Sequence, residues 1–302
     1  MEKNFKEFID NIQLTEAQRA DAKTKYEGVI DCLAHEFYDR DANSNDQFLF
    51  GSYKTKTNIT PMDEMQDVDV VFKITTEIQQ QYNDNPEALL QKCKKALQKK
   101  YSTTDKIRPW VNVILVKFAM NHHNVEVLPC LDQDNGIFLI PDSSKGGYWK
   151  EIDYRGQIDS FTDSNSKTNN LTRELDQMLK EWVRFTKSLE YHSYNLLNDV
   201  ISYLQDVYPK GKQNYKYEDI VKGFFDYKKA RTLDSDSIYS CLETAQKRAV
   251  KAIQYETEGK HIEASEEWRK IFGNQFPKSE KNEETTNREY NFGSAPSPWY
   301  TD

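Results

Sequence analysis

Apolar residues near the start of the chain recur every three to four positions, which is the spacing of one helix face. The residues on this face are Tyr26, Ile30, Leu33 and Phe37. Just ahead of them, Thr15 and Gln18 stand at the spacing of a capping box, in which two residues satisfy each other's backbone amides. The pattern therefore predicts a long helix over residues 14–40.

Three apolar runs of strand length follow, at 67–74 (DVDVVFKI), 110–119 (WVNVILVKFA) and 124–131 (NVEVLPCL). Between the first two, residues 85–101 (NPEALLQKCKKALQKKY) have the spacing of a helix. This order of strand, helix, strand and strand predicts a small mixed sheet with helices packed against it.

The second half of the chain has a helical pattern. A polar stretch at 156–170 (GQIDSFTDSNSKTNN) breaks the strand pattern, and we expect it to carry the chain between two lobes. The first helix beyond it places an apolar set on one side: Leu171, Leu175, Met178, Leu179 and Trp182. Further helical segments lie at 193–208, 236–256 and 260–272. The sequence predicts an α+β protein, with a sheet-containing lobe and N-terminal helix at 1–165, a helical lobe at 166–278 and a flexible polar tail at 279–302.

Composition narrows the function classes. The 302 residues are 37% hydrophobic and 30% charged, and no apolar run reaches the ~18 residues of a membrane span, so no membrane association is expected. The N-terminus lacks the apolar core of a secretory signal, and four cysteines without a CxxC pair suit a reducing cytoplasm. The formal charge of −8 argues against stable, sequence-independent binding to DNA or RNA.

Two aspartates interrupt the run at 67–74, where a strand would favour apolar residues. Asp67 and Asp69 are two positions apart, so they would point to the same face of a strand. Two carboxylates held so close repel one another unless a cation lies between them. Oxygen ligands of this kind select Mg²⁺ or Mn²⁺, which commonly bind together with nucleotide phosphates.

Two neighbouring signals extend this motif. Upstream, Gly51 and Ser52 would let the backbone approach a triphosphate closely and would offer a hydroxyl and amide donors. Downstream, Glu126 lies in a strand with Val125 and Val127 facing the other way, and it is the expected third acid. An Asp-x-Asp or a Gly-Ser pair alone is common in proteins, whereas the combination at these spacings is far more specific.

The combination resembles the signature of the polymerase-β-like nucleotidyltransferases. Within that superfamily, the segments at 136–155, 171–182 and 266–277 are similar to those of the bacterial cGAS/DncV-like nucleotidyltransferases, the signal synthases of CBASS anti-phage systems. The resemblance spans residues 45–277. The closing W-x-x-x-F-G-x-x-F-P element is the more discriminating part. Two departures stand out: Lys56 occupies a position where glycine is usual, and Glu126 replaces the usual third aspartate.

The resemblance implies a two-lobed enzyme with its active site in the cleft between the lobes. Asp67, Asp69 and Glu126 would hold two divalent ions, Mg²⁺ or Mn²⁺, while a ribose hydroxyl attacks an α-phosphate and pyrophosphate leaves. A second round on the linear intermediate would close the ring. In the helical lobe, the resemblance assigns Lys180 and Ser193 to phosphate and Tyr194 to base stacking, although a helical tyrosine is more often a core residue.

Three other features of the sequence bear on the site: a basic stripe, a possible zinc site and an alternative third acid. Arg173, Lys180, Arg184 and Lys187 form a basic stripe that could equally be a solvated helix face. His122, His123 and Cys130 lack a fourth ligand for zinc at a suitable spacing, and no GxxxxGK[ST] loop is present. Asp132 or Asp134 could replace Glu126 as the third acid, but a loop after a proline is a poor place for a fixed ligand.

Two function classes therefore remain open. The first is a synthase of a cyclic di- or oligonucleotide from NTPs; its product would be sensed by a downstream effector, and regulatory partner proteins could switch it on. The second is a nucleotidyltransferase acting on RNA or on a non-nucleotide acceptor, with an inactive nucleotide-binding module as a weaker third. The acidic charge disfavours an RNA substrate, and the W-x-x-x-F-G-x-x-F-P ending favours the first class.

Overall fold

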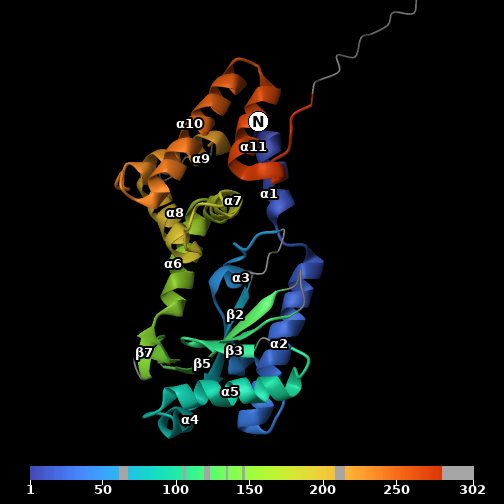
Figure 1. Ribbon diagram of the computed structural model, residues 1–302, viewed down its shortest axis with the longest axis vertical. Coiled ribbons are helices and arrows are strands. Elements are labelled where there is room, and N and C mark those ends of the chain that lie inside the picture. Colours follow the sequence, from blue (N-terminus) through green and yellow to red (C-terminus); the bar gives the residue numbers. More distant parts are fainter. Residues whose placement is uncertain are drawn as a thin grey trace, which may run out of the picture.

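The computed structural model describes residues 1–60, 67–104, 107–118, 123–133, 135–144, 147–207 and 215–280. Its described part has two halves along the long axis of the molecule: a sheet flanked by helices in one half, and a bundle of helices in the other (Figure 1). The helix α6 runs from the sheet-containing half toward the bundle. None of the described helices is long and apolar enough to cross a lipid bilayer.

Helices account for most of the described chain. In the sheet-containing half and its connection they are α2 (Glu16–Tyr38), α3 (Gly51–Thr55), α4 (Thr76–Gln81), α5 (Pro86–Lys100) and α6 (Tyr154–Lys167). In the bundle they are α1 (Glu2–Ile12), α7 (Leu171–Phe185), α8 (Ser193–Val207), α9 (Tyr217–Lys229), α10 (Ser237–Thr257) and α11 (His261–Phe272). Short 3₁₀ helices lie at Ser44–Asp46 and Gly273–Gln275. The capping box expected at the start of α2 is present, with Thr15 and Gln18 bonded to each other.

The described strands form one mixed sheet in the order β1-β2-β5-β4-β3, and β6 and β7 extend it from the end of β5. Their bounds are β1 (Gln47–Leu49), β2 (Asp67–Ile74), β3 (Ile107–Trp110), β4 (Val113–Val116), β5 (Asn124–Asp132), β6 (Phe138–Asp142) and β7 (Tyr148–Ile152). The central pair, β2 and β5, is parallel, and the other pairs are antiparallel. The expected α+β class with a small mixed sheet and a C-terminal helical part is confirmed.

Each half has its own apolar core. In the sheet-containing half, buried residues of α2 and α5 cover one face of β2, β4 and β5. In the bundle, the apolar side of α7 predicted from the sequence is buried against α8, α9, α10 and α11. The central aromatic side chains of this second core are Trp182, Phe224, Phe225, Trp268 and Phe272.

Three expectations need correction. Residues 156–170 do carry the chain toward the bundle, but most of them form helix α6 rather than a break in regular structure, with Asp153 capping the first turn and Phe161 buried (Figure 1). The single strand expected at 110–119 is a hairpin of β3 and β4, turned at Val111 with a positive φ of 56°. The first twelve residues were assigned to the sheet-containing lobe, but Phe5 and Phe8 of α1 pack in the core of the bundle. The tail expected at 279–302 lies outside the described residues from position 281 onward.

Candidate active site

Three acidic side chains meet at the centre of the sheet. Alternation along β2 buries Val68 and Val70 completely on one face and leaves Asp67 and Asp69 on the other. Because β2 and β5 are parallel neighbours, Asp69 lies opposite Glu126 in the register, and Asp67 lies opposite Asn124. The strand pairing therefore brings together the three acids that the sequence singles out.

The backbone of Gly51 packs directly against this cluster. A Cβ atom at Gly51 would lie 2.0 Å from Oδ2 of Asp69, and the residue has a φ of +63°, which glycine adopts without strain. Both observations require glycine here. The backbone at the start of α3 therefore lies so close to Asp69 that no side chain fits between them.

The electrostatics of the cluster are those of crowded carboxylates. Burial, followed by the charges of Glu126 and Asp67, raises the pKa of Asp69 to about 8, although the charge of Lys180 opposes the rise. Burial, followed by the charge of Asp67, raises the pKa of Glu126 to about 7. At neutral pH, the protein alone therefore resists full ionisation of this site, and bound cations would relieve that resistance.

A cavity of about 290 Å³ opens beside the carboxylates. Seven of the eight residues that the sequence assigned to the site line it: Gly51, Ser52, Asp67, Asp69, Lys180, Ser193 and Tyr194. Glu126 does not line this cavity, although it lies next to Asp69 in the sheet. The cavity has the size of a small-molecule pocket and takes its walls from the sheet, α3, α6, α7 and α8.

Asp132, one of the two alternative third acids, is already paired with two cations. Asp132 accepts two hydrogen bonds from the guanidinium of Arg155, at 2.7 and 2.6 Å, and forms an ion pair of 2.8 Å with Lys73. These cations hold the pKa of Asp132 below its usual range. Asp134, the other alternative, lies outside the described residues. This arrangement favours Glu126 as the third acid.

The loop after α3 accounts for the departure at Lys56. Lys56 ends α3 with a φ of 57° and a ψ of 34°, a left-handed conformation that glycine adopts most easily. The turn lets the amide of Thr57 donate to the carbonyl of Ser52 at 2.9 Å. The backbone at this position favours glycine, and in this chain Lys56 adopts the same left-handed conformation.

The helical side of the cavity comes from α7 and α8. Tyr194 is 54% exposed at the start of α8, so it is not a core residue, and Ser193 precedes it. Lys180, on α7, lies nearly buried beside the loop after α3, whereas Arg184 pairs with Glu181. The basic stripe is therefore divided between a lysine at the cavity and an arginine held by its own helix.

Several residues that line the first cavity were not predicted from the sequence. Tyr154, Gln157 and Ile158 reach the cavity from α6, and Asn198 reaches it from α8. Gln157 and Ile158 were missed because the sequence did not predict a helix over residues 156–170. A second cavity of about 260 Å³ shares Ser52, Asp67, Lys180 and Ser193 with the first and adds Asn58, Arg184 and Tyr191 to its wall.

A different group has the tightest spacing of possible metal ligands. Among the described residues, only Asp31, His35 and Asp41 have ligand atoms that all lie within 4.8 Å of one another, and they lie on the surface at the end of α2. The acids of β2 and β5 are spread more widely than that. His123 and Cys130, considered for zinc, do not form such a group in the described part of the chain, and His122 lies outside it.

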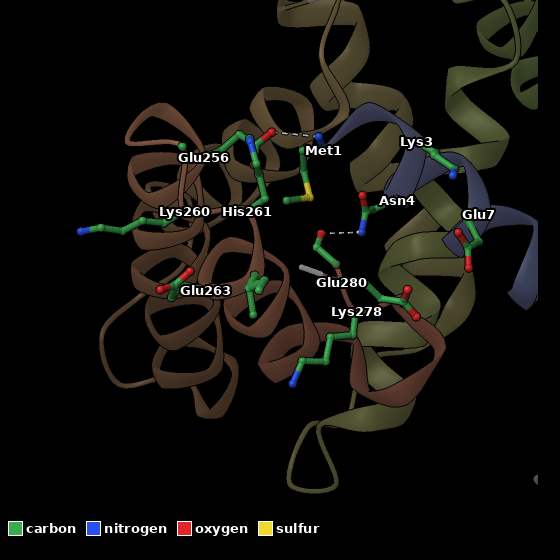
Figure 2. Close-up of a pocket in the computed structure, with 13 residues that line it drawn as sticks. Met1, Lys3, Asn4, Glu7, Glu256, Lys260, His261, Glu263, Lys278 and Glu280 are labelled. Carbon is green, nitrogen blue, oxygen red and sulfur yellow. Dashed lines mark hydrogen bonds and ion pairs between the residues drawn. The ribbon is translucent and has the colours of Figure 1, made fainter. Parts of the chain in front are cut away.

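A hollow of about 970 Å³ lies in the bundle, away from the carboxylates. Figure 2 shows its mixed lining, with Lys3 and Glu7 from α1 and Lys260, His261 and Glu263 from the start of α11. The amine of Met1 is paired with Glu256 there at 2.9 Å. Its positive and negative side chains balance one another, and none of the acids of β2 or β5 reaches it.

Comparisons with known proteins find relatives of this chain in sequence and in fold. The sequence model of a family described as the Second Messenger Oligonucleotide or Dinucleotide Synthetase domain matches residues 1–165. The chain is 30% identical over 166 residues to a probable cyclic nucleotide synthase of Bacillus cereus strain VD146. That match covers 47% of this chain and 47% of the relative, so it spans about half the length of each protein.

Solved structures share the fold over most of the chain. The cyclic AMP-GMP synthase DncV of Vibrio cholerae, in complex with a linear intermediate, superposes with a TM-score of 0.68 at 12% identity, covering 89% of this chain and 93% of that one. CdnC of Escherichia coli MS115-1, in a complex with a HORMA protein, gives a TM-score of 0.66 at 16% identity, covering 91% and 98%. At these identities, the likeness concerns the fold.

Proposed function

Because this chain belongs to the Second Messenger Oligonucleotide or Dinucleotide Synthetase family, we propose that it is a template-independent nucleotidyltransferase that condenses NTPs into a cyclic di- or oligonucleotide. The observation that carries the proposal is the meeting of Asp67, Asp69 and Glu126 on neighbouring strands, with the backbone of Gly51 against Asp69. Such a site suits charge neutralisation at a transferring phosphoryl group.

The residues present fit a divalent cation. Three carboxylates supply only oxygen ligands, and burial together with their mutual repulsion raises the pKa of Asp69 and of Glu126, which a bound cation would reverse. We assign Asp67, Asp69 and Glu126 as the residues that would hold two ions, Mg²⁺ or Mn²⁺. When bound, such ions would lower the pKa of a ribose hydroxyl and neutralise the departing pyrophosphate.

The protein's own groups would bind and orient the nucleotide. The hydroxyls of Ser52 and Ser193 and the ammonium of Lys180 border both cavities beside the carboxylates, where they suit the negative charge of a triphosphate. Tyr194 is exposed at the cavity wall and offers a ring face on which a base could stack. Catalysis of this kind rests on positioning and electrostatics, so no covalent intermediate with the protein is required.

The cellular setting is inferred from the same family relationship. We propose that the product is a second messenger in anti-phage (CBASS) signalling, made in the cytoplasm and sensed by a downstream effector. The solved complex of CdnC with a HORMA protein supports the expectation that a regulatory partner protein acts on this chain as well. The negative formal charge of −8 supports a small-nucleotide substrate over DNA or RNA.

The experiment that tests this function uses the protein with nucleotides alone. Purified protein is incubated with the four α-labelled NTPs and Mg²⁺ or Mn²⁺, then treated with phosphatase. We expect a phosphatase-resistant labelled product, because a ring has no terminal phosphate. Label that becomes resistant only after an RNA or a non-nucleotide acceptor is added would favour the alternative transferase, and the absence of any transfer would refute both.

A further inference from the structure

Side chains of α7 hold the loop after α3 at three successive backbone carbonyls. The amide of Gln177 donates to the carbonyl oxygens of Lys56, at 3.0 Å, and Asn58, at 3.4 Å. The ammonium of Lys180 donates to the carbonyl of Thr57 at 3.1 Å and to its hydroxyl at 2.9 Å. These contacts join the helical half to the segment that begins with Gly51 and Ser52.

The position of Lys180 depends on a carboxylate one turn earlier on the same helix. Asp176 is 0% exposed, and its Oδ2 lies 2.9 Å from Nζ of Lys180, whose side chain is 11% exposed. In the described part of the chain, Lys180 is the one cation within ion-pair distance of Asp176. Burial raises the pKa of Asp176, while the charge of Lys180 and hydrogen bonds from Lys180 and from the Thr57 hydroxyl oppose that rise.

We propose that Asp176 is a positioning residue for nucleotide binding, acting through Lys180; this inference rests on the proposed function. A lysine has four flexible methylenes and three rotatable donors, so an ammonium needs partners to stay in one place. The ammonium of Lys180 donates two hydrogen bonds to Thr57 and forms an ion pair with Asp176. Asp176 thereby fixes the ammonium at the wall that the two cavities share, to which Ser52 and Asp67 also belong.

The ion pair of Asp176 and Lys180 could have either of two roles, and these predict different results. A purely structural pair would affect the stability of the bundle and nothing else. A positioning pair would change the affinity for a nucleotide, and it would do so only while the lysine is present. The two roles can be told apart because Asp176 does not line either cavity and so does not touch the nucleotide itself.

The test is a double-mutant cycle on nucleotide affinity. Wild type, Asp176→Asn, Lys180→Met and the double variant are titrated calorimetrically with the α,β-methylene analogues of ATP, GTP, CTP and UTP, each with Mg²⁺. We expect Asp176→Asn to weaken the Kd of the best-bound analogue by about tenfold, the size of one charge-assisted hydrogen bond. In the Lys180→Met background, the same substitution should change the Kd by less than about twofold, because its effect passes through the lysine.

A control variant and the double variant distinguish the positioning role from a loss of folding. Glu267→Gln is the control: it neutralises a carboxylate of α11 whose side chain is 6% exposed and paired with Lys251 and Lys270, and it should leave the Kd unchanged. The double variant removes both charges together and should fold even if a single variant does not. An unchanged Kd in Asp176→Asn, or an equal loss with and without Lys180, would overturn the inference while leaving the proposed function standing. If the wild type binds none of the four analogues, the proposed function itself fails and the inference fails with it.

Discussion

Replacing Asp69 by asparagine should stabilise the metal-free protein at neutral pH while removing its activity. The substitution keeps the shape of the side chain and eliminates a charge whose pKa the site raises to about 8. For an acid whose pKa is higher in the folded state than in the unfolded state, wild-type stability is greatest below the unfolded-state pKa. That stability is lost as the pH rises through the folded-state pKa. Asparagine has no such dependence.

The size of the effect follows from the shift. Between the unfolded-state pKa near 4 and the folded-state value of about 8, each pH unit costs the wild type at most about 1.4 kcal/mol relative to the variant. Over three pH units, the upper bound is about 4 kcal/mol. Asp69 borders a cavity open to water, and its neighbours share the protons, so we expect about half of this. For a chain of this length, ~2 kcal/mol corresponds to a difference in Tm of about 4 °C.

The assay is thermal unfolding of both proteins in EDTA from about pH 5 to about pH 8, where the gain in Tm of Asp69→Asn should grow with pH. Asp132→Asn is a control of opposite sign. Arg155 and Lys73 hold the pKa of Asp132 low, so its removal should lower Tm by an amount that is constant over this range. If Asp69→Asn unfolds at a lower temperature than wild type at the upper pH, or if its gain does not vary with pH, the reasoning about crowded carboxylates is wrong.

Three other outcomes follow from the same geometry. Glu126→Gln should still bind nucleotide with metal but lose most turnover, and Glu126→Asp should keep part of it; near wild-type product formation by Glu126→Gln would exclude this residue as the third acid. Gly51→Ala should lose activity and at least several degrees of Tm, because its Cβ would lie 2.0 Å from Oδ2 of Asp69, and a normal Tm would show that this approach is not as close as described. Deleting residues 281–302, a stretch too polar to bury a core, should leave Tm and in vitro synthesis nearly unchanged; a large fall in Tm would show that the tail stabilises the body.

The sequence predicted the centre of the site because its signals are local. Alternation along DVDVVFKI gave β2 with both aspartates on one face, and NVEVLPCL gave β5 with Glu126 between two buried valines. The register that sets Asp69 opposite Glu126 is a property of strand pairing. The sequence predicted Glu126 as the third acid but did not predict this register.

The errors came from segments whose structure depends on distant partners. Residues 156–170 are rich in Ser, Thr, Asp and Asn, which favour turns, yet α6 forms there because Tyr154 and Phe161 are buried. Similarly, the first residues pack on the bundle because Phe5 contacts Trp268 and Phe276, which lie at the far end of the described chain. Apolar residues recur at helix spacing in α1, as at Phe5, Phe8 and Ile12, but this spacing does not indicate which part of the molecule the helix packs against. The ties from α7 to the loop after α3 were missed for the same reason.

The most direct test of the central claim compares product formation by wild type, Asp67→Ala and Asp69→Ala from labelled NTPs with Mg²⁺ or Mn²⁺. Wild type should yield a phosphatase-resistant product without any added acceptor, and both variants should remain folded and yield none, because a two-ion site cannot form without either aspartate. Retention of more than a few per cent of product formation by either variant would contradict the assignment of these carboxylates as the catalytic centre.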